Sequence, residues 1–472
     1  MKNVPCTSSF ILIYSFKMES SKMTKKNKKK HYLSKQEFIF NFISLIIIII
    51  ITLYFGIRSF YYYGQQNSSK NNSKLILSDI ILNNNKLVKD GDGLHRNNNG
   101  YYFRGHVINN YLFAFNRMFR IISVSDTGNI KLVSEDNAAS FMWGEKYPYH
   151  QSNLYTWLTK TTNKYSGVYY NTIPNINKFL IKTTYTEDTL NKKIILSNKK
   201  YSDYITTLGI NDYLNSGGSH GYLNNNKIFY LMGTDENKQN LYVSEEGLVE
   251  STDGLDGYGV RAVITLRKNS EITSGDGTLN NPYVLKQDNN INYIDTYVKL
   301  GNDVWKVFNE DNGILKMYLY GYITTNNIPV LKSYSKESSL FDLTDKYNIA
   351  YYLNNIYVNS LTYNNYLVPN KYYIGELSTD TGYLYQNIYN GEIECKVGLL
   401  NIFDYVSNNL FDDYFHLNNT SNISNIQYST NSKGLVQEEE VFETKHIVPV
   451  ISINKNSIKS GSGTINSPYS VE

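Results

Sequence analysis

The longest hydrophobic segment of the chain lies near its N-terminus. It reads FIFNFISLIIIIIITLYFGI, runs from Phe38 through Ile46 and Ile50 to Ile57, and contains no charged residue. As a helix it would measure about 30 Å, the thickness of the hydrocarbon core of a bilayer. A segment without a polar face is typical of a membrane-spanning helix and not of a helix packed on a protein core. The pattern therefore predicts a transmembrane helix over residues 37–58.

Charged residues flank this segment unequally. Residues 1–36 contain nine Lys and one Glu, whereas Arg58 is the basic residue that directly follows the segment. The positive-inside rule then predicts a single-pass protein of the cell membrane, with a cytosolic N-terminus and extracytoplasmic C-terminal domains. A cleaved signal peptide is the alternative. Small residues should then follow the apolar stretch, but residues 59–63 read SFYYY.

Beyond this segment the hydrophobic positions form short runs. Arg120–Val124 and Asn129–Val133 are rich in β-branched residues and flank an Asp-Thr-Gly turn signal, which predicts a hairpin. Asn153–Leu158 and Asn211–Leu214 fit short helices. These patterns predict an α+β fold in which antiparallel strands lie at both ends of the unit, with short helices and long loops between them.

The same unit occurs twice. Val263–Ser270 matches Val450–Ser457 at a spacing of 187 residues, and Ser274–Thr278 matches Ser460–Thr464 at a spacing of 186. A repeat of this length predicts tandem domains rather than a solenoid. We therefore divide the chain into a basic cytosolic tail at 1–36, the transmembrane helix at 37–58, a polar stalk at 59–88 with a short helix at Leu75–Leu82, and extracytoplasmic repeat domains at 89–287 and 288–472.

Composition and charge narrow the class of protein further. Hydrophobic residues make up 41% and charged residues 19% of the chain, so most of it should fold. The net charge of +4 is the sum of +8 in residues 1–36 and −4 in the remainder, which predicts no nucleic-acid partner. Cys6 and Cys395 lie far apart in the sequence, so neither a disulfide framework nor a CxxC metal site is predicted.

The repeated blocks resemble often duplicated surface domains of Gram-positive gut bacteria. Gly259–Val263 is similar to the GVRPV signature that ends those domains ahead of a Ser-Gly-x-Gly-Thr turn. The resemblance implies a C-type-lectin-like fold, as in formylglycine-generating enzymes, and a binding scaffold rather than fixed chemistry. In the second copy Val448-Pro449 replaces Arg261-Ala262. The other resembling stretches are Asp90–Leu94, Tyr101–Gly105, Phe119–Ile122, Gly398–Leu400 and Asp404-Tyr405.

Motifs of catalysis occur without their usual context. Residues 217–221 fit GxSxG, but no hydrophobic strand precedes them, as a nucleophile elbow requires, so a loop is favoured. Asp90–Gly93 begins like a calcium loop but lacks the later ligands, so a turn is favoured over a weak Ca²⁺ site. The histidines show no paired spacing. We predict no catalytic residue, no metal ligand and no cofactor.

Tyrosine numbers 45 in the chain, and tyrosine stacks well on sugars. An AT-rich genome, which inflates Tyr and Asn together, is the alternative explanation. Trp143, Trp157 and Trp305 are predicted core residues. Arg261 lies inside an apolar run, where a buried structural ion pair is favoured over a ligand contact. The candidate ligand-binding residues are Arg261, Tyr351, Tyr352, Tyr357, Tyr372 and Tyr373.

The function predicted from these observations is display of two tandem, non-catalytic binding or adhesion domains on a bacterial surface. The membrane is one partner, and a glycan, cell-wall polymer or protein is the expected ligand. An extracytoplasmic enzyme acting on cell wall or glycans is the first alternative, which a pair of carboxylates in one pocket would favour. A structural component of a surface complex is the second, which a large exposed apolar patch would favour.

Overall fold

A computed structural model shows the fold of the chain from residue 74 onwards, and residues 74–472 form one compact unit. The predicted tail, transmembrane helix and first part of the stalk lie outside the described residues. In the part of the chain that is described, no helix is long and apolar enough to cross a bilayer. The described residues are 74–144, 148–162, 166–187, 190, 200–287, 292–375, 391–408, 415–421, 423–432 and 435–471.

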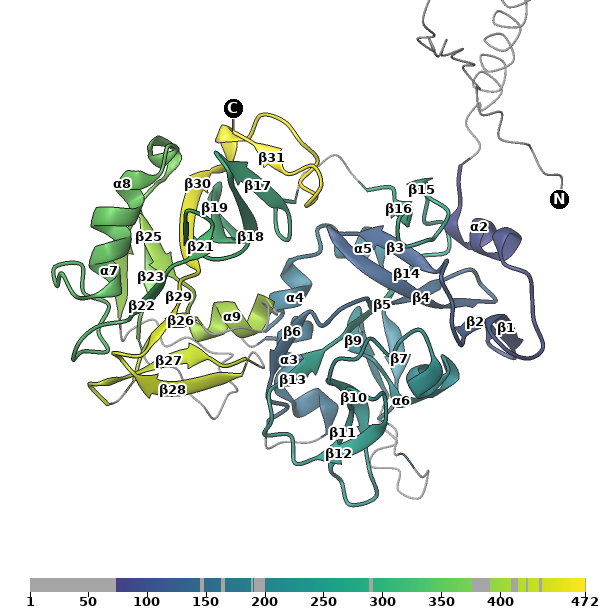
Figure 1. The fold of residues 1–472 in the computed structure, drawn as a ribbon. Helices are drawn as coiled ribbons and strands as arrows, with labels where there is room; N and C mark the ends of the chain where they lie inside the picture. Colours follow the sequence, from purple (N-terminus) through teal and green to yellow (C-terminus); the bar gives the residue numbers. More distant parts are fainter. Residues whose placement is uncertain are drawn as a thin grey trace, which may run out of the picture. The chain divides into compact units, whose positions relative to one another are not determined.

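The fold is mixed α+β, built mostly of sheets with a few short helices (Figure 1). The predicted helices are present, as α3 (Asn153–Leu158) and α6 (Ile210–Asn215). The Ser152 side chain caps α3 by accepting a hydrogen bond from the Tyr155 backbone N–H at 3.1 Å. The other described helices of the first repeat are α4 (Val168–Asn171) and α5 (Ile176–Phe179), and those of the second are α7 (Ile349–Tyr351), the π-helix η3 (Tyr352–Tyr357), α8 (Val358–Ser360) and α9 (Ile402–Asn408).

The main sheet of the first repeat contains the predicted hairpin. Strands β4 and β5 pair in antiparallel fashion around Gly128, whose φ of 83° favours glycine. The closing strand β16 pairs in parallel with the early strand β3, so the two ends of the repeat lie side by side. The strand order is β15 (Ile272–Ser274), β16 (Tyr283–Leu285), β3 (Tyr111–Ala114), β4 (Arg117–Ser125), β5 (Ile130–Ser134), β14 (Ala262–Leu266) and β9 (Ile205–Thr207), with β1 (Gly93–Asn97) and β2 (Gly100–Arg104) joined through β4.

The six strands of the main sheet of the second repeat follow the order of β16, β3, β4, β5, β14 and β9 in the first. Its closing strand also pairs in parallel with its opening strand, and the other pairs are antiparallel. The equivalent strands of the two repeats therefore occupy equivalent places. The order is β31 (Tyr469–Ser470), β17 (Tyr297–Leu300), β18 (Asp303–Asp311), β19 (Ile314–Leu319), β30 (Pro449–Asn454) and β25 (Val397–Leu399).

Each repeat contains a second group of paired strands besides its main sheet. In the first, the order is β12 (Val249–Thr252), β11 (Asn240–Val243), β10 (Phe229–Thr234), β13 (Tyr258–Val260) and β6 (Ala139–Phe141). In the second, β28 (Val436–Glu440), β27 (Ile426–Thr430) and β26 (His416–Thr420) pair, as do β29 (Thr444–His446) and β22 (Leu331–Ser333). A parallel bridge between Phe415 and His446 links the two groups, just as Phe229 pairs in parallel with Gly259 in the first repeat. The same order therefore recurs here as well.

Shorter ribbons complete the two repeats. The strands of these ribbons are β7 (Thr183–Tyr185) with β8 (Tyr201–Asp203), β20 (Thr324–Thr325) with β21 (Ile328–Pro329), and β23 (Asn370–Tyr373) with β24 (Glu392–Cys395). The cores are apolar and aromatic, and Trp143, Trp157 and Trp305 are buried in them as predicted.

The predicted stalk does not extend through residues 74–88. Helix α2 (Leu77–Asn84) buries Leu77 and Ile81 completely, and Ile76 forms a β-bridge with Glu271. Leu77 and Ile81 are four residues apart and so lie on one face of the helix, which packs on the first repeat. The apolar patch inside an otherwise polar segment thus belongs to the folded unit.

Candidate binding groove

An open depression of about 610 Å³ lies on the first repeat. Its apolar floor contains Ile173 and Ile176, which are buried, and its rim carries exposed amide side chains and one lysine. Tyr170 forms part of its wall and is half-buried. The complete lining is Tyr170, Asn171, Ile173, Asn175, Ile176, Asn177 and Lys178.

The local sequence explains why this segment bends into a groove. Gly167 has a φ of 76° ahead of helix α4, and Asn175 has a φ of 51° ahead of helix α5. Both residue types tolerate the left-handed region better than others do. Each short helix therefore begins directly after a left-handed residue, and Asn171, Asn175 and Asn177 of this segment are exposed to solvent.

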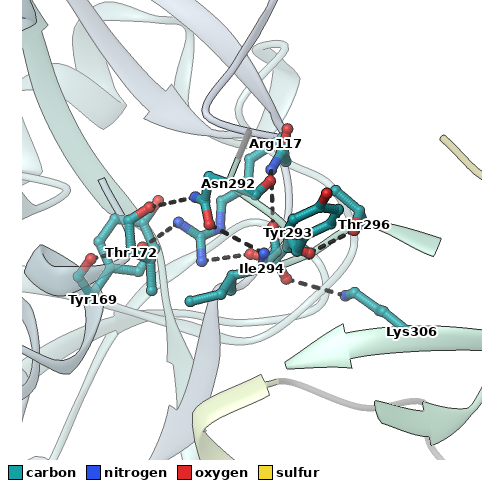
Figure 2. Close-up of polar contacts among 10 residues, drawn as sticks. Arg117, Tyr169, Thr172, Asn292, Tyr293, Ile294, Thr296 and Lys306 are labelled. Atoms are coloured by element: carbon teal, nitrogen blue, oxygen red, sulfur yellow. Dashed lines mark hydrogen bonds and ion pairs between the residues drawn. The ribbon is translucent and has the colours of Figure 1, made fainter. Parts of the chain in front are cut away.

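A half-buried charged cluster contacts this segment (Figure 2). The Arg117 guanidinium donates to Thr172 Oγ1 at 2.6 Å and lies 4.4 Å from the centre of the Tyr169 ring. Asn292 Nδ2 donates to the Thr172 carbonyl at 2.9 Å. Tyr169 and Thr172 are neighbours of the groove residues Tyr170 and Ile173, so these contacts fix the groove's backbone.

The same cluster joins the segment between the repeats to both of them. Asp295 forms an ion pair with Arg117 at 2.5 Å and with Lys306 of strand β18 at 3.4 Å. Burial alone would raise the pKa of the Asp295 carboxyl, but Arg117 and Lys306 together hold it below its ordinary value. Asn116 Nδ2 donates to the carbonyl oxygens of Asn292 and Ile294 at 2.6 and 3.0 Å. Ion pairs and hydrogen bonds therefore fix the segment between the repeats, which we call the joint, to both of them.

A second depression of about 300 Å³ adjoins the groove, and Lys178 lines both. Arg267 connects them, because its Nε and Nη2 donate to the Asn177 carbonyl at 3.1 and 2.8 Å. Glu271 forms ion pairs with Lys74 at 2.9 Å and with Lys286 at 2.8 Å. The remaining residues that line the second depression are Phe179, Asn269, Ser270, Leu285 and Gln287.

Arg261 is not placed to contact a ligand. It is 0% exposed and lies where the chain passes from strand β13 of one sheet to strand β14 of the other. Its Nε and Nη2 donate to the Ser134 carbonyl at 2.9 and 2.8 Å, and its Nη1 donates to the Leu223 carbonyl at 2.6 Å. The prediction of a structural role was right, but the hydrogen bonds go to backbone carbonyls instead of a carboxylate. Burial lowers its pKa to about 10.

The candidate tyrosines of the second repeat do not form an exposed stacking surface. Tyr357, Tyr372 and Tyr373 are buried, and Tyr351 and Tyr352 are half-buried. Tyr372 OH donates to the Val450 carbonyl at 3.2 Å, so this residue is part of the core. The π-helix η3 and strand β23 turn these side chains inward, a direction that tyrosine content alone could not reveal.

The segments that match catalytic and calcium-binding motifs form the loop and the turn that the sequence favoured. Residues 217–221 follow helix α6, not a strand, and the half-buried Ser219 lies on a single 3₁₀ turn with its Oγ 3.1 Å from His220 Nδ1. Asp90–Gly93 is an exposed turn with a φ of 80° at Gly91. Within the described ranges, no group of three or more His, Cys, Asp or Glu side chains is placed to hold a metal ion.

The interior of the second sheet differs between the repeats. In the first, the buried Tyr230 and the half-buried Tyr242 both pack on the half-buried Tyr258, with ring centres 5.2 and 4.7 Å from it. In the second, the buried His416 donates from Nε2 to the Lys332 carbonyl at 2.7 Å and accepts at Nδ1 from Gln427. Nearby, Lys445 and Ser429 both contact Glu439, at 2.5 and 3.0 Å. The second repeat thus has a polar core where the first has an aromatic one.

Sequence reasoning missed the groove. The signal available was the run YYNTIPNINK at residues 169–178, in which asparagines, a proline and isoleucines alternate. Comparison with protein families, with characterised proteins and with solved structures gives no match to this chain. The site must therefore be interpreted from its own geometry.

Proposed function

We propose that this chain is a membrane-anchored bacterial surface protein whose two repeats are non-catalytic binding domains, and that the groove at residues 170–178 binds a glycan. The observation that carries the proposal is the composition of the groove, which combines exposed amides and one tyrosine over an apolar floor. Amides exchange hydrogen bonds with hydroxyl groups, and an aromatic face packs on the apolar side of a sugar ring.

The resemblance of the sequence to duplicated surface domains supports the same proposal. A C-type-lectin-like fold would present loops such as residues 167–180 on a stable sheet, which is a common arrangement for binding sites. The membrane anchor over residues 37–58 would keep the binding domains at the cell surface.

An enzyme of glycans or cell wall is the alternative. Glycoside hydrolysis uses two carboxyl groups on opposite sides of the scissile bond. The residues that line the two depressions include one carboxylate, Glu271, and it is already paired with Lys74 and Lys286. This composition favours binding over hydrolysis at these depressions.

Glycan-array binding by the full-length protein in detergent micelles tests the proposal. We expect binding that Tyr170→Ala and Asn171→Ala weaken, because these variants remove the stacking face and one amide of the rim. Tyr320→Ala is the matched control, since Tyr320 is an exposed tyrosine of the second repeat, 48% accessible. Absence of binding to glycans, cell-wall polymers and proteins, or equal loss in the control, would overturn the proposal.

A further inference from the structure

We infer that the ligand of the groove is an anionic polymer, and that Lys178 and Arg267 bind its acidic groups in the adjoining depression. This inference rests on the proposed function, because it names the chemical class of ligand for the same surface. The shared chemistry is a repeating unit that carries hydroxyl groups and either a phosphate or a carboxylate.

The two depressions form one continuous surface. Lys178 lines both, and Arg267 of the second is hydrogen-bonded to the backbone carbonyl of Asn177 in the first. A polymer that fills the amide-rimmed groove would therefore extend directly past these cations. A ligand of one or two sugar units would not need the second depression.

The charge of the second depression is positive. Lys178, Arg267 and Lys286 line it together with the single carboxylate Glu271. Lys74, which precedes helix α2 in the sequence, forms an ion pair with Glu271. Hydrogen bonds from Lys286 and Lys74 lower the pKa of Glu271, which keeps it ionised and paired with these lysines. The balance of the five side chains is +3. Arginine and lysine at a solvent-exposed rim are the usual partners of phosphate and carboxylate oxygens.

Arg267 also has a fixed orientation. Two of its nitrogens are held by the Asn177 carbonyl, so the guanidinium stays beside the groove and does not have to be ordered when a ligand binds. Preorganisation of this kind lowers the entropic cost of binding.

The second repeat provides a built-in comparison. The sequence match of Val263–Ser270 with Val450–Ser457 places Asn454 at the position of Arg267. Lys455 at the next position forms an ion pair with Glu310 at 2.8 Å. The guanidinium at this position is therefore particular to the first repeat, and Arg267→Asn introduces a residue that the same fold already accepts.

Affinity measurements on the full-length protein in detergent micelles test this inference. The probes are poly(glycerol phosphate), polygalacturonate and an uncharged β-glucan, each at low and at high salt. We expect at least one anionic polymer to bind more tightly than the β-glucan, and its binding to weaken as salt rises. The double variant Lys178→Gln/Arg267→Asn should lower that affinity about tenfold and reduce the salt dependence. Lys455→Gln should leave it unchanged.

The three polymers and the variants distinguish the possible results. Preference for the phosphate polymer or for the carboxylate polymer identifies the acidic group, and either supports the inference. Equal binding of the anionic polymer by the wild type and the double variant would overturn it. Binding of the β-glucan alone, lost in Tyr170→Ala, would overturn it while the proposed function stands. Binding of none of the three polymers would overturn the inference, and the glycan array then decides the proposed function separately. Arg267→Lys, which keeps the charge, should retain part of the affinity if the double variant proves unstable.

Discussion

His416 of the second repeat occupies the place that Tyr230 occupies in the first. Tyr230 pairs with Tyr242 across its sheet, and His416 pairs with Ser429 at the same point of the equivalent hairpin. The Trp143 ring lies 5.4 Å from Tyr230, and the Tyr334 ring lies 5.7 Å from His416. The repeats therefore kept their strand order while the chemistry of their cores diverged.

The buried His416 should make the folded unit sensitive to acid. Burial lowers its pKa from 6.5 to about 4. The hydrogen bond to the Lys332 carbonyl opposes this shift, the nearby Lys445 cation adds to it, and Glu439 opposes it more weakly. Between these values the unfolded chain binds a proton that the folded chain does not, so stability falls as the pH falls below about 6.5 and the loss is complete near pH 4. The loss should approach about 3 kcal/mol.

Urea unfolding of the wild type and of His416→Gln at a series of pH values measures this contribution. The difference between the two proteins should shrink as the pH is lowered from neutrality, because the variant lacks the titrating group. A difference that stays constant with pH would contradict the assignment.

Replacing Asn418 by methionine should stabilise the protein. Asn418 is 0% exposed, and both polar atoms of its side chain lack a hydrogen-bond partner within the described part of the chain. The equivalent residue is Met232, since the backbone N–H groups of Met232 and Asn418 donate at 2.7 Å to Leu208 and Leu400 respectively. An unsatisfied buried group costs about 1–3 kcal/mol, so Asn418→Met should raise the free energy of unfolding by about 1–2 kcal/mol.

Thermal unfolding of Asn418→Met, with Met232→Asn as the reverse substitution, checks this expectation. The reverse variant should lose stability, because it places an amide among apolar side chains. Destabilisation by Asn418→Met would instead mean that the amide holds an internal water molecule.

Asp295→Asn should destabilise the joint between the repeats. The substitution leaves Arg117 and Lys306 without the carboxylate that both contact. These side chains are half-buried, so the cost should lie between about 1 kcal/mol for a surface pair and about 3–5 kcal/mol for a fully buried one. Because the pKa of Asp295 is lowered, its contribution is present above about pH 4 and declines as the pH falls further. Chemical denaturation at neutral pH measures the effect.

Asp136→Asn is the control for this experiment. Asp136 and Lys227 form an exposed ion pair at 2.8 Å, with side chains 55% and 47% accessible. Such a pair contributes about 1 kcal/mol or less. Equal effects of the two substitutions would show that Asp295 behaves as a surface residue.

Leu77→Ala should destabilise the folded unit even though residue 77 lies in a segment whose composition suggests a stalk. Leu77 is 0% exposed on the buried face of helix α2, and truncation of such a side chain costs about 2–5 kcal/mol. Leu75→Ala is the matched control, because Leu75 is 46% exposed and its loss should have little effect. Thermal unfolding of both variants compares them, and equal melting temperatures would mean that α2 is not part of the core.

Local patterns were enough to predict the elements whose cause is local. The β-branched runs around Gly128 and the helix at Asn153–Leu158 form as expected, because turn chemistry, capping and periodicity act over a few residues. The three tryptophans are buried as predicted, since large apolar side chains gain most from burial. The spacing near 186 residues indicated a duplicated unit, and the six equivalent strands of the two main sheets follow the same order.

The roles of individual residues were predicted less well where their contacts come from distant parts of the chain. Tyr372 and Tyr373 face the core and Arg261 binds two carbonyls, although their residue types suit a binding surface equally well. The groove at residues 170–178 adjoins a depression lined by Arg267 and Lys286, which are about a hundred residues away in the sequence. Sequence determined the strands, turns and repeat, because these follow from local propensity and pattern. Only the tertiary structure decided which polar residues are buried and which line a surface, because burial depends on neighbours that the fold brings together.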